Sequence, residues 1–132
     1  MAMKNYDVVL LTESRYVNPV KLNPYIENVM REDELVLNAF DKNHLKSTKK
    51  DWNDANFDWS CTKTVIFRST WDYFDQFQNF ENWLNKVQKK CQLINSYNHI
   101  KWNLDKRYLI DLKSWGLPIT ESVFVKKNSN TI

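Results

Sequence analysis

The side chains with the most chemical potential stand directly after a short apolar run in the middle of the chain. Residues 65–67 read V-I-F, and R-S-T-W-D-Y follows at 68–73. A continuous run of β-forming residues is typical of a strand buried on both faces of a parallel sheet. Ligands of open α/β sheets bind beyond the carboxyl ends of such strands. We therefore expect Arg68, Thr70 and Asp72 to contact a small polar substrate.

A simpler interpretation of this cluster is open at the level of the sequence. Arg68 and Asp72 can pair with each other as a structural salt bridge, as oppositely charged surface residues often do. Trp71 and Tyr73 would then cover the edge of the sheet. Spacing alone does not separate a binding loop from this purely structural arrangement.

A second polar cluster follows the first apolar run of the chain. Residues 8–11 read V-V-L-L, and T-E-S-R-Y follows at 12–16. Because this run also predicts a buried strand, Glu13 and Arg15 stand at a strand end and are candidates for substrate contact. The alternative is a solvated loop, which the nearby Pro19 and Pro24 also favour.

Hydrophobic periodicity predicts the elements that position these two clusters. We expect strands at 6–11, 45–50, 65–67 and 92–95, with helices at 24–42 and 75–90. Strands that alternate with helices favour an α/β fold with a mainly parallel open sheet, flanking helices and right-handed crossovers, in the Rossmann-like manner.

The two helices each have a predicted apolar face. In the first helix it consists of Ile26, Met30, Leu37 and Phe40, and the predicted solvated face carries Glu27, Glu32, Asp33 and Glu34. In the second helix the residues predicted to pack on the sheet are Phe77, Phe80, Leu84 and Val87.

The last third of the chain predicts one more helix and one more strand. Asn103 is a good N-cap, Gly116 supplies a stop, and residues 121–125 have the composition of a strand. Basic and aromatic residues interleave at 97–108, a pattern that also suits single-stranded nucleic acid. Packing of Tyr108 into the helical stripe explains the pattern more simply, so we expect no nucleic-acid partner.

Composition excludes several classes of function. The 132 residues carry a net charge of +3, too small an excess to indicate nucleic-acid binding. Two cysteines and two histidines without ligand spacing predict no metal site, and the apolar runs are too short for a signal peptide or a membrane span. We expect free thiols and a cytoplasmic location. Gly116 is the single glycine, so no glycine-rich phosphate loop can form.

Four motifs in order carry a resemblance to a known family. They are V-I-F-R-S-T-W-D-Y at 65–73, F-x-x-W-L at 80–84, W-N-L-D-K-R-Y-L at 102–109 and G-L-P-I-T at 116–120. Together they resemble the ATP-grasp superfamily, in the glutathione-synthetase-like branch that includes the cycloserine-forming ligase. The resemblance covers nearly the whole chain, from the first strand to about residue 125.

The resemblance implies a domain organisation and a chemistry. Residues 1–100 would form the pre-ATP-grasp domain, which contributes substrate contacts and often a dimer surface, and residues 101–132 would begin the ATP-grasp region. Such ligases use ATP and Mg²⁺ to activate a carboxylate for attack by an amine. Lys106 occupies the place of a lysine that helps to bind the ATP phosphates, a suitable role for a compact cation.

The resemblance also has a gap. The second ATP-binding lysine, the glycine-rich flap and the magnesium ligands of the family have no counterpart in this sequence. We therefore expect no catalytic residues and no metal ligands here, and no activity without a separate ATP-grasp domain or split-gene partner. A homodimer formed through the apolar residues at 121–125 is expected, with fraying of that segment as the alternative. A free-standing α/β binding or interaction module without catalysis is the other interpretation of the whole chain.

Overall fold

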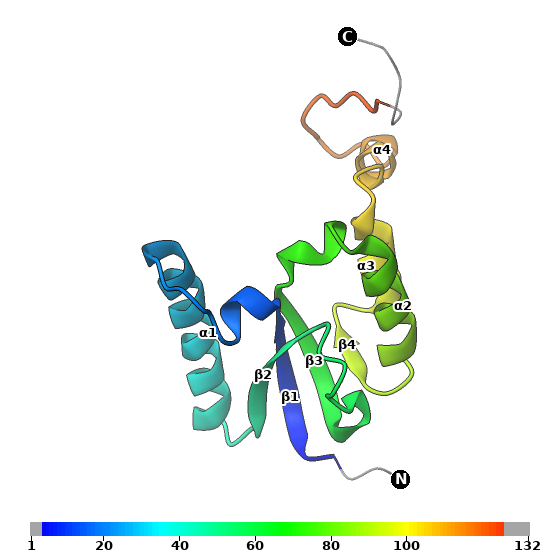
Figure 1. Ribbon diagram of the computed structural model, residues 1–132. Coiled ribbons are helices and arrows are strands. Elements are labelled where there is room, and N and C mark those ends of the chain that lie inside the picture. Colours follow the sequence, from blue (N-terminus) through cyan, green and yellow to red (C-terminus); the bar gives the residue numbers. More distant parts are fainter. Residues whose placement is uncertain (1–3, 126–132) are drawn as a thin grey trace. The chain divides into compact units, whose positions relative to one another are not determined.

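The computed structural model describes residues 4–125 and divides into two compact units between Tyr97 and Asn98. The first unit contains a sheet and its two long helices (Figure 1). The second unit contains short helices. Each unit is described by itself.

The first unit is built on four parallel strands. They are β1 (Tyr6–Thr12), β2 (Ser47–Asp51), β3 (Thr62–Ser69) and β4 (Gln92–Ile94), in the spatial order β2-β1-β3-β4. The two central strands contain the continuous apolar runs, because a strand between two neighbours and two helical layers meets no solvent. The predicted α/β fold with a parallel open sheet is confirmed.

The strand register brings three strand ends level with one another. Thr12 of β1 lies opposite Asp51 of β2 on one side and opposite Ser69 of β3 on the other. The pairing of β1 with β3 shifts by one residue after Leu11, so that Arg68 is passed over. A local irregularity of this kind often re-aims a side chain at a functional edge.

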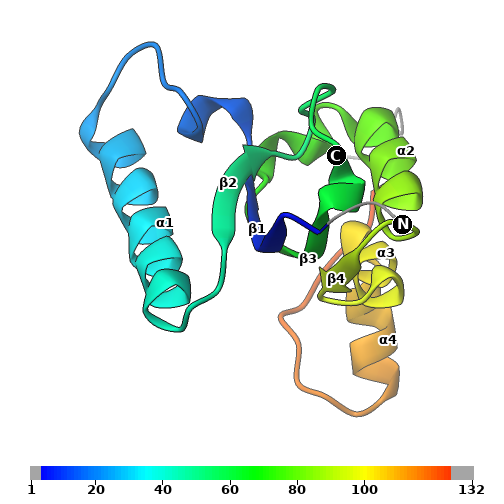
Figure 2. The same ribbon diagram turned by 90° about the horizontal axis from the view of Figure 1, so that it is seen from below.

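The helices α1 (Pro24–Lys42) and α2 (Phe77–Val87) lie on either side of the strands in Figure 1. The neighbouring residues Phe67 and Arg68 of β3 point to different helices, Phe67 to the aromatic residues of α2 and Arg68 to the acidic residues of α1. Since successive side chains of a strand point to opposite faces, the two helices cover opposite faces of the sheet. Figure 2 shows the same layers from below.

The face covered by α2 is an aromatic core. Trp52 is fully buried and packs edge-on against Phe80, with ring centroids 5.1 Å apart, and Phe67 and Trp83 complete the cluster. Phe80, Leu84 and Val87 are buried as predicted, but Phe77 is 42% exposed, so its predicted packing is wrong. The reason is that α2 begins only at Phe77, where the first turn has not yet reached the sheet.

The face covered by α1 contains an unexpected charge. Asp33, predicted to be solvated, is 1% exposed and forms ion pairs with Lys49 of β2 and Arg68 of β3. Asp33 belongs to the same helical stripe as Ile26 and Met30, at spacings of seven and three residues. Helical periodicity, rather than charge, decided which residue of α1 faces the sheet.

Short 3₁₀ helices follow the central strand ends. η1 (Ser14–Tyr16) comes after β1, η3 (Trp71–Phe74) comes after β3, and η2 (Trp59–Cys61) leads into β3. η1 and η3 lie at the upper edge of the sheet in Figure 1. The polar clusters found in the sequence are therefore folded into tight turns at the strand ends.

The second unit corrects the prediction of a single helix from Asn103. Its helices are α3 (Tyr97–Leu104), which begins at the division, and α4 (Tyr108–Ser114), so Asn103 lies inside a helix and caps nothing. The chain turns at Asp105, whose carboxylate accepts a hydrogen bond from the backbone amide of Arg107 at 2.9 Å. Aspartate favours turns in this way because its side chain competes for backbone donors.

An indole holds the second unit together. Trp102 donates a hydrogen bond to Asp111 at 2.7 Å and stacks on Trp115, with ring centroids 5.8 Å apart. Gly116 follows α4 with φ +78°, the conformation expected of the predicted stop.

The segment after Gly116 does not form the predicted strand. Residues 121–125 are exposed and pair with no strand, so that prediction is wrong within the described residues. The reason is that an isolated extended segment without a neighbour cannot form ladder hydrogen bonds.

Candidate functional site

The carboxyl ends of β1, β2 and β3 meet at one edge of the sheet. The chain leaves β1 toward β2 on one side, and leaves β3 toward β4 on the other. The edge between β1 and β3 is therefore a topological switch point, where the connections diverge and open α/β sheets bind their ligands. Each of these three strand ends carries a carboxylate, from Glu13, Asp51 and Asp72. We refer to these three residues as the carboxylate edge.

Glu13 is the most unusual residue of the carboxylate edge. Its side chain is 1% exposed, so the predicted alternative of a solvated loop is wrong for this residue. One oxygen, Oε1, accepts hydrogen bonds from the guanidinium of Arg15. The other oxygen, Oε2, is buried and has no hydrogen-bond partner among the described residues. A buried carboxylate oxygen without a donor is energetically costly, and such groups are rare in native structures.

The surroundings of Glu13 disfavour its charge. Burial raises the pKa of Glu13, and the negative charge of Asp72 raises it further, while Arg15 and the backbone amide of Asp72 lower it. Burial outweighs the single ion pair because the Arg15 side chain is itself 64% exposed and hydrated.

Asp72 is held by neutral donors instead of an arginine. Its Oδ1 accepts a hydrogen bond from the indole Nε1 of Trp52 at 2.7 Å, and its Oδ2 accepts one from Gln76 Nε2 at 3.2 Å. The alternative interpretation in which Arg68 and Asp72 pair with each other is therefore wrong. Because Trp52 is part of the core, Asp72 is tied to the rigid part of the sheet.

Arg68 serves a different part of the molecule. Its Nη2 lies 2.5 Å from Glu32 Oε2 and its Nε lies 3.6 Å from Asp33 Oδ1, both on α1. The structure thus brings Glu13, Arg15, Thr70 and Asp72 to one edge, whereas the guanidinium of Arg68 turns to the face covered by α1. Thr70 is 8% exposed, and its carbonyl accepts from the amide of Tyr73 at 3.3 Å.

A pair of hydroxyls fixes the two central strand ends. Thr12 Oγ1 and Ser69 Oγ lie 2.7 Å apart and are both buried. The backbone amide of Trp52 donates to the carbonyl of Thr12 at 3.0 Å, so the end of β2 is joined as well. These short contacts position the carboxylate edge on strands rather than on a free loop, which gives precise placement.

Sequence reasoning missed Asp51 and Trp52. Burial raises the pKa of Asp51, and the charges of Asp72 and Asp54 raise it further, while the backbone amide of Asn53 lowers it. The signal was present, since Asp51 directly follows a predicted parallel strand and the carboxyl ends of such strands share one edge. Trp52 carried no signal, because only the fold shows that its indole reaches Asp72.

Aromatic residues border the carboxylate edge. Tyr16 is buried and contacts Trp71 edge-on at 5.7 Å between ring centroids, and Trp71 also contacts Tyr25 at 6.5 Å. Trp71 and Tyr25 are 43% and 61% exposed. Exposed aromatic side chains beside carboxylates suit ligands that carry both a polar group and an apolar body.

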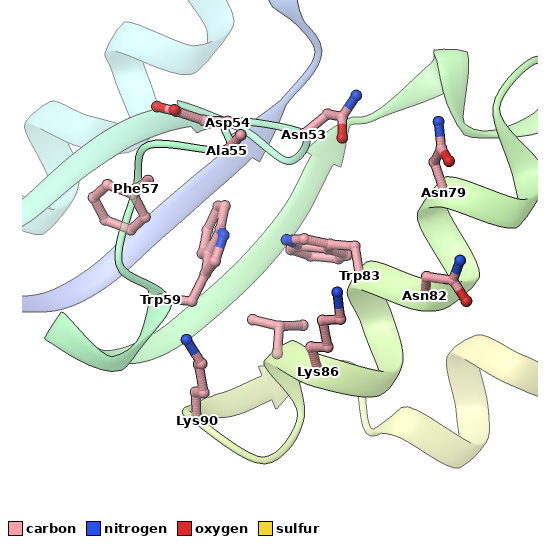
Figure 3. Close-up of a pocket in the computed structure, with 11 residues that line it drawn as sticks. Asn53, Asp54, Ala55, Phe57, Trp59, Asn79, Asn82, Trp83, Lys86 and Lys90 are labelled. Atoms are coloured by element: carbon pink, nitrogen blue, oxygen red, sulfur yellow. The ribbon is translucent and has the colours of Figure 1, made fainter.

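A separate groove lies against α2 (Figure 3). It has a volume of about 550 Å³, with Phe57, Trp59 and Trp83 as its aromatic part and Lys86 and Lys90 at one end. The indole Nε1 of Trp83 is buried, and no oxygen or nitrogen of the described part of the chain accepts a hydrogen bond from it. The ring of Trp59 lies edge-on to this indole at 5.3 Å, an arrangement that suits a weak N–H···π contact. The lining of this groove includes none of Glu13, Arg15, Thr70 and Asp72, so it is a weaker candidate than the switch point.

Lys106, predicted to bind ATP phosphates from just inside a helix, lies in the turn between α3 and α4 of the second unit. Its ammonium group lies 5.4 Å from the ring centroid of Tyr108. Lys106 is exposed, as a lysine that meets a ligand needs to be.

Residues 4–125 lack two features, a metal-binding cluster and a membrane-spanning helix. No group of three or more His, Cys, Asp or Glu side chains in this range is arranged to hold a metal ion. No helix in the same range is long and apolar enough to cross a membrane.

The fold is that of an open α/β domain, and the carboxylate edge lies at the kind of switch point where such domains bind ligands. Residues 8–95 match the family model described as the D-cycloserine synthetase DcsG, N-terminal domain. This match covers most of the first unit, and the chain belongs to that family.

Two known proteins support this membership. The chain is 34% identical over 82 residues to the cycloserine biosynthesis protein DcsG of Streptomyces lavendulae, which covers 62% of this chain and 27% of that protein. The crystal structure of D-cycloserine synthetase DcsG superimposes with a TM-score of 0.71 at 27% identity, over 85% of this chain and 34% of that one. The chain thus spans about a third or less of the length of these relatives.

Proposed function

We propose that the chain is the substrate-binding N-terminal domain of a DcsG-like synthetase of the ATP-grasp type, which joins a carboxylate to an amine. The observation that carries the proposal is the gathering of Glu13, Arg15, Thr70 and Asp72 at the switch point of a fold that matches this domain. These residues are proposed to contact the substrate, with Asp51 as a fifth member.

In this proposal the chemistry of phosphoryl transfer belongs to another domain or partner chain. ATP and Mg²⁺ would bind there, and Lys106 would contribute one cation toward the phosphates. The residues of the first unit would bind and orient the substrate and exclude water from it. Arg68 would act indirectly, by fixing α1 to β3 beside the site.

A titration with D-cycloserine, the compound in the names of the relatives, tests the proposed substrate site. Amide signals of the ¹⁵N-labelled chain are recorded by NMR as D-cycloserine is added. We expect saturable shifts confined to residues 12–16, 51–52 and 69–76. Shifts confined to the groove of Figure 3, or no shifts at tens of millimolar, would contradict the proposal.

A titration calorimetry experiment with Mg-ATP tests the division of labour. One lysine supplies about one charged contact, worth roughly 1.5–3 kcal/mol. The chain alone should therefore bind Mg-ATP no tighter than about 1 mM and should not hydrolyse it. Micromolar binding would place the nucleotide site within this chain.

The exposed apolar residues of the second unit support a proposal of homodimer formation. Val123, Phe124 and Val125 are 86%, 41% and 64% exposed, and exposed apolar segments favour association. Light scattering on the full chain should give twice the mass of the monomer. A version that ends at Pro118 should give the mass of its monomer. Equal monomer masses for both would exclude the dimer.

A second candidate function is a free-standing binding module without catalysis. It predicts the same substrate shifts at the carboxylate edge but no functional coupling to an ATP-grasp domain. Mixing the chain with the remaining part of the Streptomyces lavendulae protein and measuring ADP release separates the two.

A further inference from the structure

The carboxylate edge carries more negative charge than its partners balance. Glu13, Asp51 and Asp72 stand at three adjacent strand ends, and burial raises the pKa of the first two. Asp72 is held by an indole and an amide, which carry no charge. Arg15 is the cation that contacts this cluster in the described part of the chain.

The guanidinium of Arg15 contacts only one of the two carboxylate oxygens of Glu13. Two nitrogens of its guanidinium converge on the same oxygen, Oε1 of Glu13, and leave Oε2 without a donor. A guanidinium that served only structure would grip both oxygens in the parallel fork that this pair favours. Its side chain is also 64% exposed and lines a hollow of about 370 Å³ with Ser14, Asn18, Pro19, Val20, Lys21 and Ile26. Arg15 therefore has space to move into, and its guanidinium is held by Glu13 Oε1 and by the ring of Tyr16, whose centroid lies 5.6 Å away.

The chemical group that would best donate a hydrogen bond to Glu13 Oε2 is a primary ammonium. A primary ammonium is a compact cation with three N–H donors, so it can donate to both Oε1 and Oε2 of Glu13, whereas the Arg15 guanidinium, as it is placed here, contacts Oε1 alone. The ring of Tyr16 packs beside this site against Trp71, and aromatic rings attract ammonium groups.

We propose that Glu13 anchors a primary ammonium group of the ligand, and that Arg15 is a resident counter-ion which this ammonium displaces. The inference rests on the proposed function, since it names the chemical group that the substrate site recognises. Once displaced, Arg15 is free to pair with an anionic group of the same ligand from the hollow beside η1. The groups that set the charge of Glu13 are Arg15 and Tyr16 of η1 and Asp72 of η3.

The test uses ethylammonium chloride as the probe on the full ¹⁵N-labelled chain. Amide shifts at 13–16 and 70–72 are followed at constant ionic strength. Tetramethylammonium, which has the charge but no N–H donor, and MgCl₂ are the comparison ligands. We expect saturable shifts with ethylammonium and none that saturate with the other two. Equal saturation by tetramethylammonium, or binding of Mg²⁺ alone, would overturn the proposal.

Three variants make the test specific. Glu13→Gln preserves shape and should weaken ethylammonium binding at least about tenfold, because a charge-assisted hydrogen bond is lost. Arg15→Gln removes the resident cation and should tighten binding, a direction that a purely structural arginine would not give. Glu27→Gln, at an exposed position in the first turn of α1, should bind as the natural chain does.

The outcomes separate this inference from the proposed function. If the titration that tests the proposed function succeeds and Glu13→Gln leaves its affinity unchanged, the ammonium anchor is wrong and the substrate site stands. If ethylammonium binds through Glu13 and that titration fails, the anchor stands and the proposed substrate is wrong. Unchanged or weaker ethylammonium binding by Arg15→Gln contradicts the displacement of Arg15.

Discussion

Two buried carboxylates of the first unit, Asp33 and Glu13, show how a structural charge differs from a charge available to a ligand. Asp33 and Glu13 are each about 1% exposed, and burial raises the pKa of both. Asp33 has a cation at each oxygen, Lys49 at 3.3 Å from Oδ2 and Arg68 at 3.6 Å from Oδ1. Glu13 has one arginine on Oε1, and its Oε2 has no hydrogen-bond partner within residues 4–125.

The contrast follows from where each carboxylate lies in the fold. Asp33 is enclosed between α1 and the sheet, where the positions of Lys49 and Arg68 are fixed by β2 and β3. Glu13 lies beyond the end of β1, where the chain diverges and none of the described elements supplies a second cation beside Arg15. A buried carboxylate with a cation at each oxygen stabilises the fold. A buried carboxylate with an unpartnered oxygen is available to a ligand.

The largest expected effect concerns the scaffold on which both carboxylates depend. Phe80 is 2% exposed and packs on Trp52 and Phe67, and Trp52 in turn holds Asp72. Phe80→Ala should lower the free energy of unfolding by about 3–5 kcal/mol, through lost burial and the cavity left behind. Urea denaturation measures it, with Phe77→Ala at the exposed start of α2 as the matched control. Equal losses in both variants would contradict the described packing.

The next effect tests the complete site. An asparagine at position 33 has one oxygen and one amide nitrogen, and both positions face a cation, so Asp33→Asn creates a conflict between two donors. We expect a loss of about 1–3 kcal/mol in the free energy of unfolding. Glu34→Asn, at a neighbouring exposed position of α1, is the control. A neutral outcome at position 33 would mean that its ion pairs do not hold α1.

The smallest expected effect concerns Glu13, which has a partner on only one oxygen. Its substitution should raise the free energy of unfolding instead of lowering it. A glutamine at position 13 can direct its oxygen to Arg15 and its amide toward the unpartnered position, so no donors conflict. Because the pKa of Glu13 is raised in the folded state, its ionised form is less favourable there than in the unfolded chain. Stability is therefore full below the unfolded pKa and falls as pH rises through the folded one.

Glu13→Gln should accordingly be as stable as the natural chain or more stable at pH 7. The difference in the free energy of unfolding between the variant and the natural chain should narrow as pH falls toward about 4.3, the ordinary pKa of glutamate. Thermal denaturation from pH 7 to 4 measures this trend. A variant that is less stable at pH 7, by as much as Asp33→Asn, would show that Glu13 is a structural residue.

The same contrast shows what could be predicted from the sequence. The apolar runs at 8–11 and 65–67 identified the central strands, because runs of that length and composition are hard to place elsewhere. The strand-end rule also located Glu13, Arg15, Thr70 and Asp72 at one edge. These features depend on local sequence and on a general property of parallel sheets.

What could not be predicted depends on partners far apart in the chain. Arg68 meets Glu32 from 36 residues away, and Trp52 meets Asp72 from 20 residues away. No local pattern distinguishes those contacts from the pairing of Arg68 with Asp72. The charge of Asp33 predicts a solvated position, but its helical position places it against the sheet, where its two cations make its burial tolerable.

The most direct measurement of the difference between the two carboxylates is a carboxyl ¹³C NMR titration of the full chain, with and without saturating ethylammonium. Binding a cation to an ionised carboxylate must lower its pKa, since the two equilibria are linked. We expect the pKa of Glu13 to fall when ethylammonium binds and the pKa of Asp33 to stay where it is. Equal shifts at both residues, or a shift at Asp33 alone, would contradict the assignment of Glu13 as the carboxylate that meets the ligand.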